Sequence, residues 1–69
     1  MIEIFKTNVQ KKSETNYVIA TIKKQFPDYI INFDLEDCDK ILRVEAFKLE
    51  PKDIINYLNC LGYICIKLE

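Results

Sequence analysis

The sequence predicts a single α+β domain whose elements follow the order βαββαβ. The length of 69 residues suits one domain, four short segments have the residue patterns of strands, and two longer segments repeat apolar residues with helical spacing. Hydrophobic residues make up 49% of the chain and charged residues 30%, which is typical of globular proteins and not of disordered chains. We therefore expect one domain over residues 1–69.

The first part of the chain predicts a strand followed by a helix. Residues 2–5 alternate in the manner of a short strand with one aliphatic face. A helix is expected from about Ser13, a suitable N-cap, to Gln25, because apolar residues recur there at every fourth position. Pro27 should end this helix, since a proline ring cannot continue the hydrogen-bond ladder.

Two strands and a second helix are expected next. Tyr29–Leu35 and Lys40–Phe47 are rich in β-branched and aromatic residues, and the polar tetrad between them suits a hairpin, so the two strands should be antiparallel neighbours. Pro51 suits the first turn of a helix, and Gly62 suits its left-handed cap. The segment Tyr63–Leu68 is the last expected strand.

This order predicts a ferredoxin-like sandwich. Both helices should cover one face of a four-stranded antiparallel sheet of order 4-1-3-2, and the other face should stay open. The residues expected to face the helices are Ile2, Ile4, Leu42, Val44, Ala46, Ile64 and Ile66. The opposite parity places four residues on the open face as a candidate contact surface: Phe5, Ile41, Tyr63 and Cys65.

The segment 55–64, Ile-Asn-Tyr-Leu-Asn-Cys-Leu-Gly-Tyr-Ile, ends a helix with a Leu-Gly-Tyr run before the last strand. Together with the layout, it resembles the heavy-metal-associated domain of copper chaperones and metal-transporting ATPases over nearly the whole chain. In that family, two cysteines in Cys-x-x-Cys spacing hold a soft metal ion after the first strand. The corresponding loop here, residues 7–13, has no cysteine, histidine or methionine but has Lys11 and Lys12. The resemblance therefore implies the fold and not the metal site, and we expect no cofactor.

Metal handling stays open through other residues. Asp37, Cys38 and Asp39 lie in an acidic hairpin, and hard cations bind carboxylate oxygens, although the spacing is not that of a calcium loop. Cys60 and Cys65 are five residues apart, but a helix end and the next strand separate them. Three cysteines cannot all pair within the chain, so we expect reduced thiols.

Other function classes are disfavoured. The chain has no histidine, the commonest general acid or base, and no serine or cysteine with an evident base partner, so we expect no catalysis. A net charge of -1 provides no broad positive field for a nucleic acid. No apolar run approaches the roughly 20 residues that span a bilayer, and residues 1–6 lack signal-peptide order, so we expect no membrane partner and a cytoplasmic location.

The resulting hypothesis is a small, non-catalytic binding module. Its open sheet face or a sheet edge should meet a protein partner or a second copy, with Phe5, Ile41 and Tyr63 as anchors. The alternative is a metal-handling protein that uses Cys38 with its acidic neighbours, or the pair Cys60 and Cys65.

Overall fold

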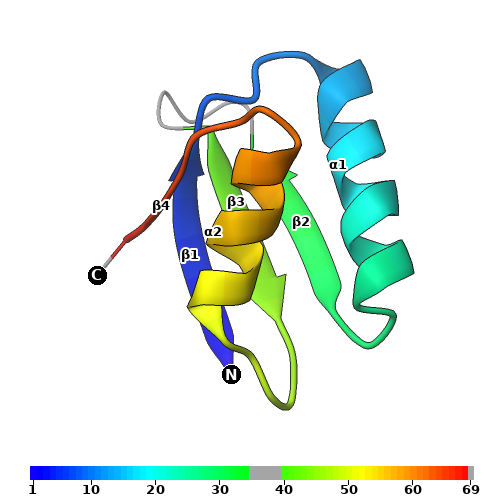
Figure 1. Ribbon diagram of the computed structural model, residues 1–69, viewed down its shortest axis with the longest axis vertical. Helices are drawn as coiled ribbons and strands as arrows, with labels where there is room; N and C mark the ends of the chain where they lie inside the picture. The colour runs from blue at the N-terminus through cyan, green and yellow to red at the C-terminus, as the bar shows by residue number, and fades with distance from the viewer. Residues whose placement is uncertain (35–39, 69) are drawn as a thin grey trace.

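The computed structural model describes residues 1–34 and 40–68, and these form an α+β fold in the predicted order βαββαβ (Figure 1). No helix in this part of the chain is long and apolar enough to cross a bilayer. The elements are β1 (Ile2–Thr7), α1 (Lys12–Gln25), β2 (Ile30–Asp34), β3 (Ile41–Glu45), α2 (Pro51–Cys60) and β4 (Cys65–Lys67).

The strands form one antiparallel sheet with the order β2-β3-β1-β4, which reads 4-1-3-2 from the β4 edge. β2 and β3 are antiparallel neighbours, as predicted, with Ile31 opposite Val44 and Phe33 opposite Leu42. β3 also pairs with β1, where Phe5 lies opposite Leu42. Both helices lie on one side of the sheet, α1 along β2 and α2 beside β4 (Figure 1).

Helix α1 begins close to the predicted position but with a different cap. Lys11, and not Ser13, is the N-cap residue, and its backbone N–H donates to a Glu14 carboxylate oxygen at 3.1 Å. This bond is one half of a capping box, and it also places a negative charge at the positive end of the helix dipole. The helix ends at Gln25, before Pro27, as predicted. Its buried face consists of Thr15, Val18 and Ile22.

Helix α2 has the predicted start and stop signals. Pro51 occupies the first turn, and Gly62 follows the helix with φ +94°. The N–H of Gly62 donates to the Asn59 carbonyl at 3.0 Å, and the N–H of Tyr63 donates to the Leu58 carbonyl at 2.9 Å. These two bonds form a Schellman motif, which satisfies the last carbonyls of the helix and turns the chain back toward the sheet.

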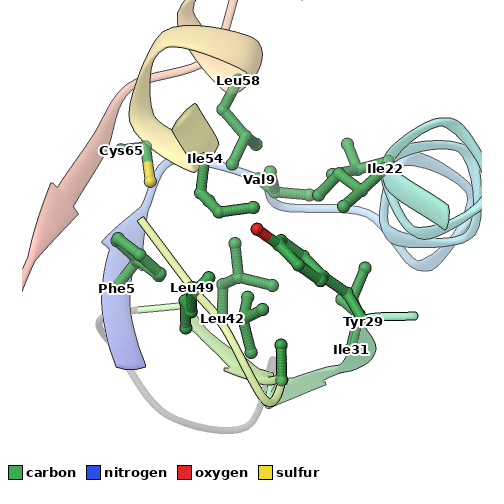
Figure 2. Packing of buried hydrophobic residues seen from close by; sticks show 13 residues of the cluster. Phe5, Val9, Ile22, Tyr29, Ile31, Leu42, Leu49, Ile54, Leu58 and Cys65 are labelled. Atoms are coloured by element: carbon green, nitrogen blue, oxygen red, sulfur yellow. The ribbon is translucent and has the colours of Figure 1, made fainter. Parts of the chain in front are cut away.

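The hydrophobic core lies between the sheet and the two helices (Figure 2). Strand residues such as Phe5 and Leu42 meet Ile54 and Leu58 of α2, and all four are fully buried. Close packing of this kind supplies most of the favourable free energy of folding in a small domain. The buried hydrophobic residues are Phe5, Val9, Val18, Ile22, Tyr29, Ile31, Leu42, Val44, Ala46, Leu49, Ile54, Leu58 and Cys65.

Aromatic contacts join the end of α1 to α2. Phe26 stacks on Tyr29 with ring centroids 4.7 Å apart, and Tyr57 of α2 meets the edge of Phe26 at 6.2 Å. The Tyr57 hydroxyl also donates to the Thr21 carbonyl at 3.0 Å. The two helices are therefore held together by specific contacts as well as by the core.

The last strand is shorter than the predicted Tyr63–Leu68. β4 covers only Cys65–Lys67, because the turn at Gly62 delays its arrival at the sheet. Hydrogen bonds continue beyond its ends: the N–H of Ile64 donates to the Asn8 side-chain oxygen, and the N–H of Leu68 donates to the Ile4 carbonyl, both at 2.8 Å. These bonds attach the edge strand to β1 despite its short ladder.

We expect Gly62→Ala to lower the free energy of unfolding by about 1 kcal/mol, because a residue with a Cβ disfavours positive φ. No atom lies within 4 Å of the added Cβ, so the loss should come from backbone conformation and not from a clash. Urea unfolding followed by circular dichroism measures the change. Gly62→Asn is the control and should lose less, since asparagine tolerates this conformation. Equal losses for the two variants would contradict the explanation.

Candidate functional site: the open face of the sheet

The loop between β1 and α1, where the resembling family binds metal, is used here for structural contacts. Val9 is fully buried in the core. The Thr7 hydroxyl donates to the Lys40 carbonyl at 2.7 Å and accepts from the Val9 N–H at 3.3 Å. The Asn8 side-chain oxygen accepts a hydrogen bond from the N–H of Ile64. The side chains of residues 7–9 therefore hold the β1 end of the sheet together.

The cysteine pair does not form a common site. Cys60 is exposed at the end of α2, whereas Cys65 is 5% exposed and belongs to the core. Burial raises the pKa of the Cys65 thiol to about 12, so the thiolate that binds a soft metal is scarce. Among the described residues, no group of three cysteine, aspartate or glutamate side chains could hold a metal ion. The hairpin candidates Asp37, Cys38 and Asp39 lie outside the described residues.

Of the four residues predicted to lie on the open face, only one does so in the structure. Phe5 has no exposed surface and Cys65 has little, so both face the helices and the prediction that they face outward is wrong. Tyr63 is also misplaced, because it precedes β4 and packs against the core, and its hydroxyl donates to Glu14 of α1 at 3.2 Å. Partial burial, followed by this bond, raises the pKa of Tyr63. Ile41 lies on the open face, opposite Lys6.

In two strands, β1 and β4, the prediction exchanged the side chains that face the helices with those that face outward. In β1 the helices cover Phe5 and Thr7, so the even positions face outward. In β4, Cys65 lies opposite Thr7 and shares its buried face, which turns Ile66 outward. The assignments made for β3 and the residue after it are correct, because Leu42, Val44 and Ala46 are buried. Ile2, Ile4 and Ile66 were expected to face the helices but lie on the open face. Ile64 was also expected to face the helices, but it precedes β4 and is 58% exposed.

The strand register arranges the open face in three rows. Residues directly opposite each other in neighbouring strands share a face, so each row can be followed across the sheet. From β2 toward β4, the rows are Ile30, Glu45, Ile2, then Asn32, Arg43, Ile4, then Asp34, Ile41, Lys6, Ile66. We call the five aliphatic members, Ile2, Ile4, Ile30, Ile41 and Ile66, the isoleucine face.

The isoleucine face leaves apolar surface in contact with water. Ile2, Ile30 and Ile66 are each 50–55% exposed, and Ile4 and Ile41 are partly exposed. Beside them, a shallow depression at the β1–β4 side of the sheet is lined by Ile2, Glu3, Ile4, Lys67 and Leu68. The exposed apolar groups thus occur on all four strands, with Ile2 and Ile4 two residues apart on β1 and with a charged side chain between the isoleucines of the first and the third row. Several apolar groups on one face are typical of contact surfaces.

The charges on the open face balance. Lys6 and Arg43 are the bases and Asp34 and Glu45 are the acids among its row members. Arg43 and Glu45 form an ion pair along β3 with an N···O distance of 3.7 Å, and both side chains are nearly half exposed. Such exposed pairs contribute little to stability. Among the described row members, the face therefore presents aliphatic groups with equal numbers of acids and bases.

One sequence signal could have identified this face. Lys6 has the same parity as Ile2 and Ile4, and lysine side chains are almost never fully buried. The competing signal is Glu3, which shares the buried parity of Phe5. The structure accommodates Glu3 at the rim of the helix side, where Lys67 lies 3.5 Å from its carboxylate. Phe47 was predicted to lie in the strand Lys40–Phe47, but β3 ends at Glu45, and the Phe47 side chain is 93% exposed.

No protein-family model matches the sequence, and no curated protein or solved structure is similar enough to count as a match.

We expect a thiol reagent such as iodoacetamide, at about pH 8, to alkylate Cys60 in the folded protein much faster than Cys65. Cys60 is exposed, whereas the Cys65 thiol is buried and mostly protonated at this pH. Mass spectrometry of proteolytic peptides separates the two sites. The control is a sample unfolded in urea, in which both thiols should react at similar rates. Similar rates in the folded protein would show that Cys65 is accessible.

The same burial predicts an alkaline loss of stability. The folded pKa of Cys65 is raised from the ordinary value of 9.0 to about 12, so its contribution is complete below about pH 9 and is lost as the pH rises toward 12. The free energy of unfolding should therefore fall more steeply with pH in the natural chain than in Cys65→Ala. Urea titrations across this range compare the two slopes. Parallel curves would rule out this contribution of the thiol.

Proposed function

We propose that this chain is a non-catalytic protein-interaction module that binds through the open face of its sheet. The observation that supports the proposal most directly is the isoleucine face, which has five aliphatic side chains, interspersed with charged ones, on the side of the sheet opposite the helices. Fully burying an isoleucine side chain stabilises a protein by roughly 1.5–3 kcal/mol, so each half-exposed one leaves about 1 kcal/mol for a partner to recover. A surface of this kind is favourable for association and unfavourable in isolation.

The proposal includes a ferredoxin-like arrangement of the kind found in heavy-metal-associated domains. The element order, the two helices on one side and the strand order β2-β3-β1-β4 support it. It does not include the metal chemistry of that family. Thr7, Asn8 and Val9 occupy the loop that would carry the ligands, and each makes a structural contact. The working surface is therefore placed on the sheet and not on the loop.

The chemistry of the isoleucine face favours a protein as its partner. Its bases are matched by acids, so it does not attract a phosphate backbone. Its flat array of branched aliphatic side chains suits another apolar surface, with the flanking polar groups forming a rim. The described part of the face also lacks a group of side chains with the residue types of a metal site.

We expect Ile4→Glu/Ile66→Glu to abolish partner capture while leaving the fold intact. Each new carboxylate lies opposite a base of the same sheet, Arg43 or Lys6, so the isolated domain should tolerate it. Buried against an apolar partner, the same carboxylates are strongly unfavourable. The measurement is quantitative mass spectrometry of proteins captured by the immobilised chain from cells that produce it, followed by titration of each identified partner into the isotope-labelled chain.

The matched control is Asn16→Glu/Tyr17→Glu, which adds the same two charges at exposed positions of α1, on the opposite side of the molecule. This variant should capture the same partners as the natural chain. Circular dichroism establishes that both variants are folded. If the sheet variant and the helix variant capture the same proteins to the same extent, the open face is not the binding surface.

A further inference from the structure

We propose that the partner of the isoleucine face is a second copy of this chain, packed face to face in a symmetric dimer. This inference rests on the proposed function, because it names the partner of the same surface. The resulting assembly has four layers, with the two sheets in the middle and a helix layer on each outside. Sheets that pack in this way lie about 10 Å apart and interdigitate the side chains of their inner faces.

The size of the face suits a dimer. The molecule measures 27 × 25 × 18 Å, and the view down its shortest axis shows α2 in front of the sheet and α1 beside β2 (Figure 1). Because these extents also include α1, the sheet face of each copy is smaller than about 700 Å², and two copies bury less than about 1,400 Å² in total. Stable interfaces begin at roughly 1,200 Å². The whole sheet face is needed to reach this size, which favours a partner as flat and as wide as the chain itself.

The charge distribution suits a copy of the same surface. A two-fold symmetric interface brings a patch against itself, so that patch must be complementary to itself. An acidic or basic face would repel its copy, but this face has two bases and two acids among its row members. The exposed ion pair between Arg43 and Glu45 is loose at 3.7 Å, and both groups can pair with their opposites in a second copy. Aliphatic side chains pack against their own kind without any penalty of this sort.

The helix side of the molecule does not compete for this role. Tyr17 of α1 is 53% exposed, but the other large apolar groups of the two helices lie in or against the core, and Phe26 and Tyr57 contact each other between the helices. Cys60 lies beside a shallow depression there, but the described part of the chain has no group of three ligand side chains that could hold a metal ion. The isoleucine face is the surface on which the exposed apolar groups of several strands meet.

The test begins with sedimentation equilibrium of the natural chain between about 1 μM and 1 mM, a range that covers the affinities expected for an interface of this size. We expect the mass to rise from 8.2 kDa to twice that value with a micromolar dissociation constant. Ile4→Glu/Ile66→Glu should weaken the dimer at least about 100-fold, because it buries like charges against each other. Asn16→Glu/Tyr17→Glu should dimerise like the natural chain.

A mixing experiment shows whether the face meets its own copy. Ile2→Lys/Ile30→Lys adds two positive charges, and both positions lie opposite Glu45 in the same row, so the fold should tolerate them. Each charged variant alone should be monomeric, and an equimolar mixture of the acidic and basic variants should form a heterodimer. Recovery of the dimer on mixing supports a face-to-face interface, because charges on other surfaces would not attract each other in this way.

The outcomes separate this inference from the proposed function. A natural chain that is monomeric at about 1 mM overturns the dimer, and so does a dimer that the sheet substitutions leave unchanged or a mixture that stays monomeric. The proposed function stands or falls on the capture experiment. If Ile4→Glu/Ile66→Glu loses other partners while the natural chain is monomeric, the face binds a different protein and only the second copy is excluded.

Discussion

The alternation of β1 is the constraint on which the rest of the structure depends. β1 is a central strand, paired on one side with β3 and on the other with β4. Because side chains alternate with a period of two, the choice of which residue faces the helices decides the face of every other residue in the strand. Phe5, fully buried between the sheet and α2, makes that choice. It turns Ile2 and Ile4 to the open face, and through the pairing of Thr7 with Cys65 it also turns Ile66 there.

The two faces of β1 compete closely, which explains why the sequence pattern leads to the wrong face. Ile2 and Ile4 look like a buried pair, and Phe5 looks like an exposed anchor, when the strand is read from residues 2–5 alone. The aromatic ring of a buried phenylalanine removes roughly 150–250 Å² of surface from water, which favours the face that Phe5 occupies. The structure resolves the competition through residues further along, since Thr7 and Val9 are also buried and continue the same side. Lys6 is the sequence signal that agrees with this outcome.

The elements with local signals are predicted well, and those that depend on long-range packing are not. Pro27, Pro51 and Gly62 act through the backbone of their own neighbours, so the ends of α1 and α2 follow from residue type. The cap of α1 differs because the helix begins at Lys12, and the carboxylate of Glu14 accepts the hydrogen bond from the N–H of the N-cap residue Lys11. Of the candidate site, Ile41 is placed correctly because β3 has one clearly apolar side, with Leu42 and Val44 both buried. β4 has no clearly apolar side, and the orientation of its side chains is set by its pairing with β1.

The contrast between the loop and the sheet decides where a function is expected. Loop side chains that serve a ligand are normally free of structural bonds, but residues 7–9 hold the ends of β1, β3 and β4 in place. Their replacement would affect stability before it affected any binding. The isoleucines of the open face are in the opposite position, since they leave apolar surface exposed and contribute less to the fold than a buried face would. A small domain buries a limited apolar area, so the apolar surface left in water on the open face supports the proposal that this face binds a partner.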